Sequence, residues 1–161
     1  MSSAKEARFR IDTPNSLPRA TKVIALDAPS EQVVKRLAQG PWNGATFFTA
    51  KAFGATPSKG DGLTGWLSDL AGRTKSLVDE INSADLVVMV ATAGESVPVA
   101  SLIGEACSLK RVMTTALITG SSGKSDDLLA KTLSQLRPWA LMLVIANSDD
   151  YIEDMLRALR A

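Results

Sequence analysis

The chain has no histidine, and its 161 residues include one cysteine, Cys107. Zinc, copper and iron–sulfur sites are built mainly from these residue types, so none can be assembled within this sequence, and only an all-oxygen site for a hard cation remains open. An intramolecular disulfide and a Ser-His-Asp triad are excluded for the same reason. Any catalysis would have to use carboxylates, lysine or a bound metal, and we identify no catalytic residue, metal site or specific cofactor.

An excess of one charge and long apolar runs are also missing. Lys and Arg number 18 against 17 Asp and Glu, so no overall field attracts nucleic acid or an anionic membrane. No run reaches the ~18 apolar residues of a membrane span, and the charges scattered through residues 1–20 are unlike a signal peptide. We therefore expect a cytoplasmic protein with neither nucleic-acid nor membrane partners.

Length and composition predict one folded domain behind a polar arm. Apolar residues make up 45% and charged residues 22% of the chain, as in ordinary globular proteins. Residues 1–20 are polar and contain two prolines, which predicts a flexible N-terminal arm. The alternation of Phe9 and Ile11 would also allow the arm to add to a sheet edge or a partner. Residues 21–161 are expected to form a single α/β domain.

Apolar segments of strand length alternate with segments of helical periodicity. Strands are predicted over 22–27, 45–49, 85–91, 113–119 and 141–146. Helices are predicted after Ser30, over 63–81, after Ser96, after Ser125 or Asp126, and over 151–159. The 63–81 helix is expected despite Gly65 and Gly72, with Trp66 in the core, and Asp150 with Glu153 resembles a capping box for the last helix. The segment 51–62 is expected to be a long loop.

This alternation predicts a three-layer, doubly wound, Rossmann-like α/β fold with right-handed crossovers. We expect a mostly parallel five-stranded sheet with strand order 2-1-3-4-5. Ligands of such sheets bind beyond the carboxyl ends of the strands where the order reverses, here between the first and third strands. The candidate ligand-binding residues at this switch point are Asp27, Thr92, Gly94, Glu95 and Ser96.

Each switch-point residue also has a structural interpretation. Asp27 and Glu95 could face one another and hold a hard cation or divide acid and base roles. Their charges could instead stabilise the N-termini of the helices that follow them. Thr92 and Ser96 could contact a polar ligand or only cap a helix.

The segment Gly120-Ser-Ser-Gly-Lys-Ser125 lies between a predicted strand and a predicted helix, the context of a phosphate-binding P-loop. The P-loop pattern has a glycine five residues before Gly123, where this chain has Ile118, so an exposed turn is the alternative. A helix N-terminus behind the segment would favour an anion. The candidate contacts for a small phosphorylated ligand are Gly120, Ser121, Gly123, Lys124 and Ser125.

Several segments between residues 21 and about 119 follow one another as in a known nucleotide-binding family. They are Lys22-Val-Ile-Ala-Leu-Asp27, Glu31–Leu37, Gly44–Phe48, Ser83–Val90 and Val97–Ile103. In this order they resemble the first strand and helix, the second strand, and the strand and helix around the signature loop of the FtsZ/tubulin superfamily. The resemblance implies a nucleotide-binding fold with subunit association.

The sequence departs from that family where phosphate would bind. Its first loop, a string of glycines in the family, is here Leu26-Asp-Ala-Pro-Ser-Glu31, which has no glycine and two carboxylates. The signature loop is shortened to Thr92-Ala-Gly-Glu-Ser96. The family's second domain has no room in a chain that ends at Ala161. We therefore expect a degenerate, stand-alone relative instead of a polymerising GTPase.

Two hypotheses follow for the function. The first is a non-catalytic α/β module that associates with itself as a homo-oligomer or with a partner protein. Trp42 and Trp139 beside prolines are its candidate contact anchors, with core packing as the alternative, and Cys107 is expected to be a small buried hydrophobe. The second is a small-molecule or nucleotide-binding protein or enzyme that uses the switch point or the Gly120–Ser125 loop.

Overall fold

The computed structural model describes residues 20–40, 42, 44–50, 66–69, 74–97, 99–120, 125–146 and 149–159. Strands and helices alternate along these residues, except that three strands follow one another between 45 and 76. The predicted arm, apart from Ala20, and the predicted loop at 51–62 lie outside the described residues. No helix in the described part of the chain has the length and apolar character needed to cross a bilayer.

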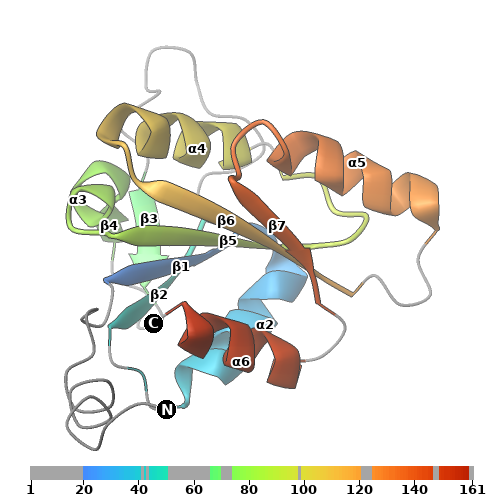
Figure 1. Ribbon diagram of the computed structural model, residues 1–161, viewed down its shortest axis with the longest axis horizontal. Helices are drawn as coiled ribbons and strands as arrows, with labels where there is room; N and C mark the ends of the chain where they lie inside the picture. The colour runs from blue at the N-terminus through green and yellow to red at the C-terminus, as the bar shows by residue number, and fades with distance from the viewer. Residues whose placement is uncertain are drawn as a thin grey trace, which may run out of the picture.

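Five parallel strands form the centre of the sheet. They are β1 (Thr21–Ala25), β2 (Ala45–Thr49), β5 (Leu86–Thr92), β6 (Met113–Thr119) and β7 (Met142–Ile145). They pair in the order β2-β1-β5-β6-β7, which confirms the predicted 2-1-3-4-5 arrangement (Figure 1). The continuous apolar run of β5 is buried along its length because helices cover both faces of the sheet.

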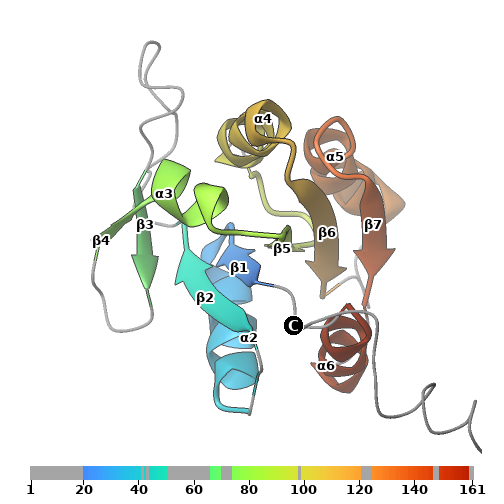
Figure 2. The same ribbon diagram turned by 60° about the vertical axis from the view of Figure 1, so that its left-hand side comes forward.

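Two antiparallel strands, β3 (Trp66–Asp69) and β4 (Thr74–Ser76), extend the sheet beyond β2 (Figure 2). The helix predicted over 63–81 is therefore wrong over 66–69 and 74–76, and within the described residues these two strands add to the five that were predicted. Of the described residues in that range, those of α3 (Leu77–Asn82) are helical. Gly65 and Gly72 each weaken a helix by about 1 kcal/mol, whereas the backbone of β2 offers hydrogen-bond partners to an added strand.

The helices form a layer on each face of the sheet, as predicted (Figure 1). One layer holds α2 (Ala28–Ala38) and α6 (Asp149–Ala158), and the other holds α3, α4 (Val99–Lys110) and α5 (Asp126–Leu136). Side chains alternate along each strand, so each layer has its own apolar core. Ile24 and Met89 pack towards α3, α4 and α5, whereas Val23 and Val88 pack towards α2 and α6.

Helix N-termini agree with the sequence prediction at α5 and differ at α4 and α6. Ser125 is the N-cap of α5, and its hydroxyl accepts a hydrogen bond from the backbone N–H three residues later. Helix α4 begins at Val99, so Ser96 is too distant to be its N-cap. Helix α6 begins at Asp149, before the predicted capping box. Glu153 Oε1 instead lies 2.8 Å from Arg157 Nη2, one turn further along α6, and the two side chains form an ion pair.

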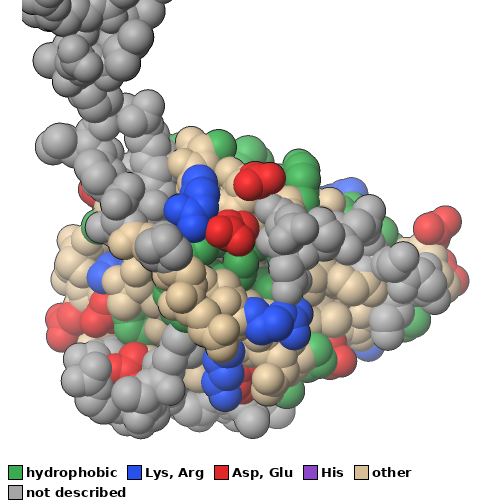
Figure 3. Space-filling model, turned by 90° about the horizontal axis from the view of Figure 1, so that it is seen from below, with side chains coloured by type: hydrophobic (Ala, Val, Ile, Leu, Met, Phe, Trp, Pro, Cys, Tyr) green, Lys and Arg blue, Asp and Glu red, His purple; other side chains and the backbone are tan. Residues whose placement is uncertain are grey.

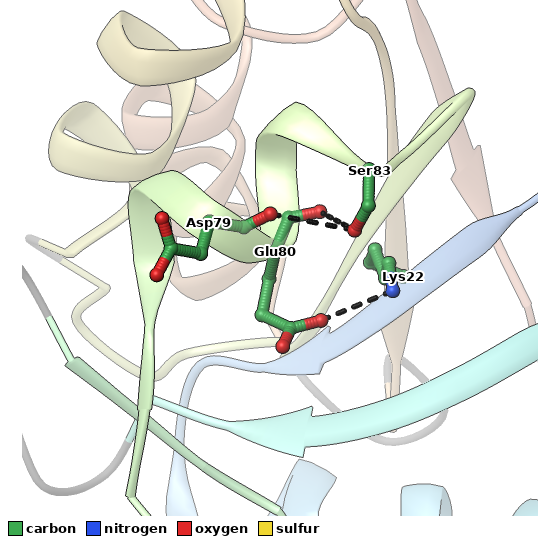
Figure 4. A network of polar contacts seen from close by, with 4 residues as sticks. All are labelled: Lys22, Asp79, Glu80 and Ser83. Atoms are coloured by element: carbon green, nitrogen blue, oxygen red, sulfur yellow. Dashed lines mark hydrogen bonds and ion pairs between the residues drawn. The ribbon is translucent and has the colours of Figure 1, made fainter.

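An ion pair fastens α3 to the first strand. Lys22 Nζ lies 3.0 Å from Glu80 Oε2, and only 12% and 19% of the two side chains are exposed (Figure 4). The Lys22 ammonium also lies 5.9 Å from the centre of the Phe48 ring. Ser83 Oγ donates to the carbonyl oxygens of Asp79 and Glu80 and closes the end of α3. These contacts hold the short helix against the sheet.

Candidate functional site

Asp27 follows β1 at the switch point and begins α2. Its backbone is extended, and its Oδ1 accepts a hydrogen bond from Ser30 N at 2.8 Å. Ser30 Oγ in turn accepts from Asp27 N at 3.2 Å, which completes a reciprocal capping box. The predicted N-cap, Ser30, is therefore wrong by three positions. Aspartate is favoured as the cap because its oxygen satisfies a free N–H and its charge complements the helix N-terminus.

The same carboxylate joins β1 to β5. Thr92, the last residue of β5, donates its N–H to Asp27 Oδ2 at 2.8 Å and its hydroxyl to Oδ1 at 2.9 Å. Asp27 is 9% exposed. Both carboxylate oxygens are thus bound by donors of the protein itself, and the two switch-point candidates Asp27 and Thr92 are brought together as a structural bridge.

Glu95 does not join this bridge. Its side chain is exposed, and no hydrogen bond or ion pair connects it with Asp27. Among the described residues, no group of three or more His, Cys, Asp and Glu side chains is placed to hold a metal ion. The predicted carboxylate pair is therefore not assembled here, because one member lies within the fold and the other lies on its surface.

Thr132 of α5 holds the loop that follows β5. Its buried hydroxyl accepts from Gly94 N at 2.9 Å and donates to Glu95 O at 3.0 Å. Gly94 has φ +90°, a conformation that glycine adopts at least cost. Thr132 was not among the predicted site residues. The available signal was a threonine among apolar residues on the inner face of a predicted helix.

Gln135, one turn further along α5, holds the rest of this loop. Its Oε1 accepts from Val97 N at 2.7 Å, and its Nε2 donates to Ser96 Oγ at 3.3 Å. Protein acceptors therefore take the backbone N–H groups of Thr92, Ala93, Gly94, Glu95 and Val97. A phosphate nest needs such N–H groups unoccupied and pointing at the ligand, so these bonds leave little for an anion to bind.

Two residues of the Gly120–Ser125 segment are described. Gly120 is exposed with φ +69°, and Ser125 caps α5. A Cβ added to Gly120 would lie 3.3 Å from Thr92 Cγ2, so the segment starts beside the switch point. Ser121, Gly123 and Lys124 lie outside the described residues. The hydroxyl of Ser125 caps α5, which is one of the two caps predicted for this helix.

A pocket of about 390 Å³ lies at the other end of the parallel strands from the switch point, where β6 and β7 begin. It is between α4 and the turn that joins α5 to β7. Gly104, Cys107 and Arg111 line it from the α4 side, Met113 from the start of β6, and Trp139 and Leu141 from the turn. Sequence reasoning proposed no site here, because these residues come from three segments that meet only in the fold.

Cys107 is buried beside this pocket. Burial raises the pKa of its thiol to about 11, and a hydrogen bond with the Thr114 side chain acts weakly in the opposite direction. The thiol is therefore protonated at neutral pH and a poor nucleophile. The prediction of a small buried hydrophobe is confirmed.

The two tryptophans named as contact anchors pack against the fold. Trp42 is half-buried, donates from Nε1 to Leu37 O at 2.7 Å, and meets the Phe47 ring edge-on at 5.7 Å between centroids. Trp139 is half-buried and packs against the core above α4. Both side chains therefore contribute to packing, which was the alternative to an exposed anchor.

The fold places the chain among the Rossmann-like, three-layer α/β proteins. No protein-family model matches the chain, and no curated protein matches it in sequence. One similar solved structure is the apo form of translation elongation factor SelB from Methanococcus maripaludis, with a TM-score of 0.49 and 12% identity. The similarity covers 89% of this chain and 36% of that one, so the chain spans about a third of the SelB structure.

Proposed function

We propose that the chain is a non-catalytic α/β module that associates with a second copy of itself through the free edge of β7. The observation that carries the proposal is the apolar exposure at this edge. Leu141, Met142 and Ile145 are 78%, 40% and 41% exposed. Within the described sheet β7 is the last strand, paired on one side only with β6.

The edge of β7 has few of the features that normally prevent strand pairing. Native sheets protect an exposed edge with charges, prolines or bulges. The sequence Leu-Met-Leu-Val-Ile-Ala over 141–146 contains no charged residue and no proline. Half of the backbone N–H and C=O groups of such a strand point away from its neighbour and can pair with another strand.

A second copy is the partner that this edge fits best. Antiparallel pairing of β7 with β7 of another copy is self-complementary and closes a two-fold dimer with a continuous sheet. The formal net charge of +1 produces little repulsion between copies. Among the described residues on the face seen in Figure 3, charged side chains of both signs are interspersed, without a single-sign patch that would select another partner.

The switch point supports a non-catalytic role. Five backbone N–H groups of the loop after β5 are bonded within the protein, and Asp27 is held by Ser30 and Thr92. A degenerate nucleotide-binding domain, which the resemblance to the FtsZ/tubulin superfamily implies, would keep the sheet and lose the phosphate loops in this way. The alternative, a nucleotide or metabolite bound at the switch point, would have to break these bonds.

The oligomeric state tests the proposal. Light scattering across a concentration series is expected to show a dimer for the native chain and a monomer for Ile145→Lys, with unchanged circular dichroism. Leu128→Lys is the matched control, because Leu128 is equally exposed, at 42%, and belongs to helix α5 instead of the β7 strand. A native monomer, or equal loss of dimer in both variants, would overturn the proposal.

A cross-link locates the interface, and a ligand panel tests the alternative. Ile145→Cys in a Cys107→Ala background has a single thiol, which is expected to form an intermolecular disulfide rapidly if two β7 edges pair. Thermal unfolding with GTP, ATP, NAD and coenzyme A, with and without magnesium, is expected to show no shift. A concentration-dependent rise with one of them would favour the binding hypothesis by mass action.

A further inference from the structure

We infer that the pocket between α4 and the α5–β7 turn is a binding site for a small carboxylate with an apolar or aromatic body. At about 390 Å³ it is near the lower end of the range for small-molecule sites. A ligand of one or two rings, or a short alkyl chain, fits this size. The pocket shares Leu141 with the proposed self-association surface, but ligand binding there does not require a second copy.

The walls of the pocket suit an apolar body. Trp139, Met113 and Leu141 contribute large apolar side chains, while Gly104 and Cys107 form part of the α4 side. Met113 and Leu141 are 49% and 78% exposed although both are hydrophobic. A ligand seated against them would remove this apolar surface from water, which favours binding in proportion to the area covered.

Arg111 supplies the charge that selects a carboxylate. It is the one charged residue among those lining the pocket, with no acidic side chain beside it. Within the described part of the chain, no ion pair joins its guanidinium to a carboxylate. A guanidinium can hold a carboxylate through two parallel hydrogen bonds, so it would fix the polar end of a ligand whose body lies against Trp139.

The backbone of Arg111 has a conformation that is unusual for a residue other than glycine. Arg111 has φ +57°, in the left-handed region, directly after the end of α4. Its N–H donates to Ser108 O at 3.2 Å, and Val112 N donates to Cys107 O at 2.9 Å, as in a Schellman helix end. Glycine is the usual residue at such a position, and non-glycine residues held in this conformation concentrate at ligand sites.

The C-terminal end of α4 disfavours a bound anion, because helix C-termini carry partial negative charge. Two of the terminal carbonyl oxygens, those of Cys107 and Ser108, already accept hydrogen bonds from Val112 and Arg111. A direct guanidinium–carboxylate contact is stronger than the screened field of a capped helix end.

The experiment is calorimetric titration of the native chain with phenylacetate and hexanoate, and with phenylacetamide as the neutral analogue. The carboxylates are expected to bind roughly tenfold or more tightly than the amide, since hydrogen bonds to charged groups exceed neutral ones by about that factor. Arg111→Gly is expected to weaken phenylacetate binding by a similar factor. This variant should fold at least as well as the native chain, because glycine accepts the left-handed backbone.

Lys110→Ala is the matched control, because it removes an adjacent positive charge that does not line the pocket. It is expected to leave phenylacetate affinity within about twofold of the native value. Three results would each overturn the inference: no heat from either carboxylate, equal affinity for phenylacetamide, or equal losses in Arg111→Gly and Lys110→Ala. Light scattering of Arg111→Gly should match the native chain, which separates this test from that of the β7 edge.

Discussion

Gly104 of α4 and Trp139 of the α5–β7 turn are packed so closely that no methyl group fits between them. A Cβ added to Gly104 would lie 2.5 Å from Trp139 Cγ and 2.7 Å from Cδ2. These atoms are near the base of the Trp139 side chain and cannot swing away as the end of a flexible chain would. The missing side chain at Gly104 is therefore what allows α4 and the turn to approach one another.

Gly104→Ala is expected to lower the free energy of unfolding by about 1–3 kcal/mol, the usual cost of overpacking, even though alanine is the better helix former. Chemical denaturation measures this change. Gly40→Ala is the control, because an added Cβ there meets its nearest atom, Leu37 O, at an ordinary 3.5 Å. That control should be neutral or slightly stabilising, and equal losses in the two variants would contradict the steric explanation.

Asp27→Ala is expected to destabilise the fold by roughly 2–4 kcal/mol, because it removes a helix cap and leaves the N–H and hydroxyl of Thr92 without their partners. Thr92→Val should cost about 1 kcal/mol, since only the hydroxyl bond is lost. A double-mutant cycle is expected to show coupling between the two sites. Glu95→Ala, at an exposed position, should change stability by less than about 0.5 kcal/mol, and a larger loss there would argue against the bridge.

The Cys107 thiol predicts a stability change at alkaline pH. Its pKa is about 11 in the folded chain against an ordinary 9.0. Between these values the unfolded chain releases a proton that the folded chain keeps, so stability falls as pH rises, by up to roughly 2–3 kcal/mol. Denaturation from pH 8 to 11 should show a steeper decline for the native chain than for Cys107→Ala. Parallel curves would rule out a titrating buried thiol.

The Lys22–Glu80 pair predicts an asymmetry between its two partners. Glu80→Ala leaves a largely buried ammonium unpaired and is expected to cost about 2–4 kcal/mol, somewhat below the value for a fully buried pair. Lys22→Met removes the charge and keeps apolar contact with Phe48, so it should cost less than Glu80→Ala. The double variant is expected to be more stable than Glu80→Ala alone. A denaturation midpoint for the double variant below both single ones would contradict this.

The parallel part of the sheet could be predicted because its signal is local. The runs at 22–27, 45–49, 85–91, 113–119 and 141–146 are strand-length apolar segments separated by helical periodicity, and buried parallel strands require both features. The chain order then leaves few topologies. The strands β3 and β4 carried no such signal, because Trp66 and Leu67 also fit a helical spacing. Only the pairing of β3 with β2 and of β4 with β3 decides between the two structures.

The candidate site was predictable in position and less so in its contacts. Sequence reasoning placed Asp27 and Thr92 at the same strand ends, and the structure joins them. It could not place Thr132 or Gln135, because side-chain bonds across more than thirty-five residues depend on how α5 docks. The pocket beside Arg111 depends in the same way on the distance between α4 and a distant turn.

The bridge from Asp27 to Thr92 and Ser30 also determines how the switch point can respond to its surroundings. A dissolved anion arriving there would compete with a carboxylate that is part of the same chain and therefore always present at high effective concentration. The bridge therefore clamps the ends of β1 and β5 together from within the chain.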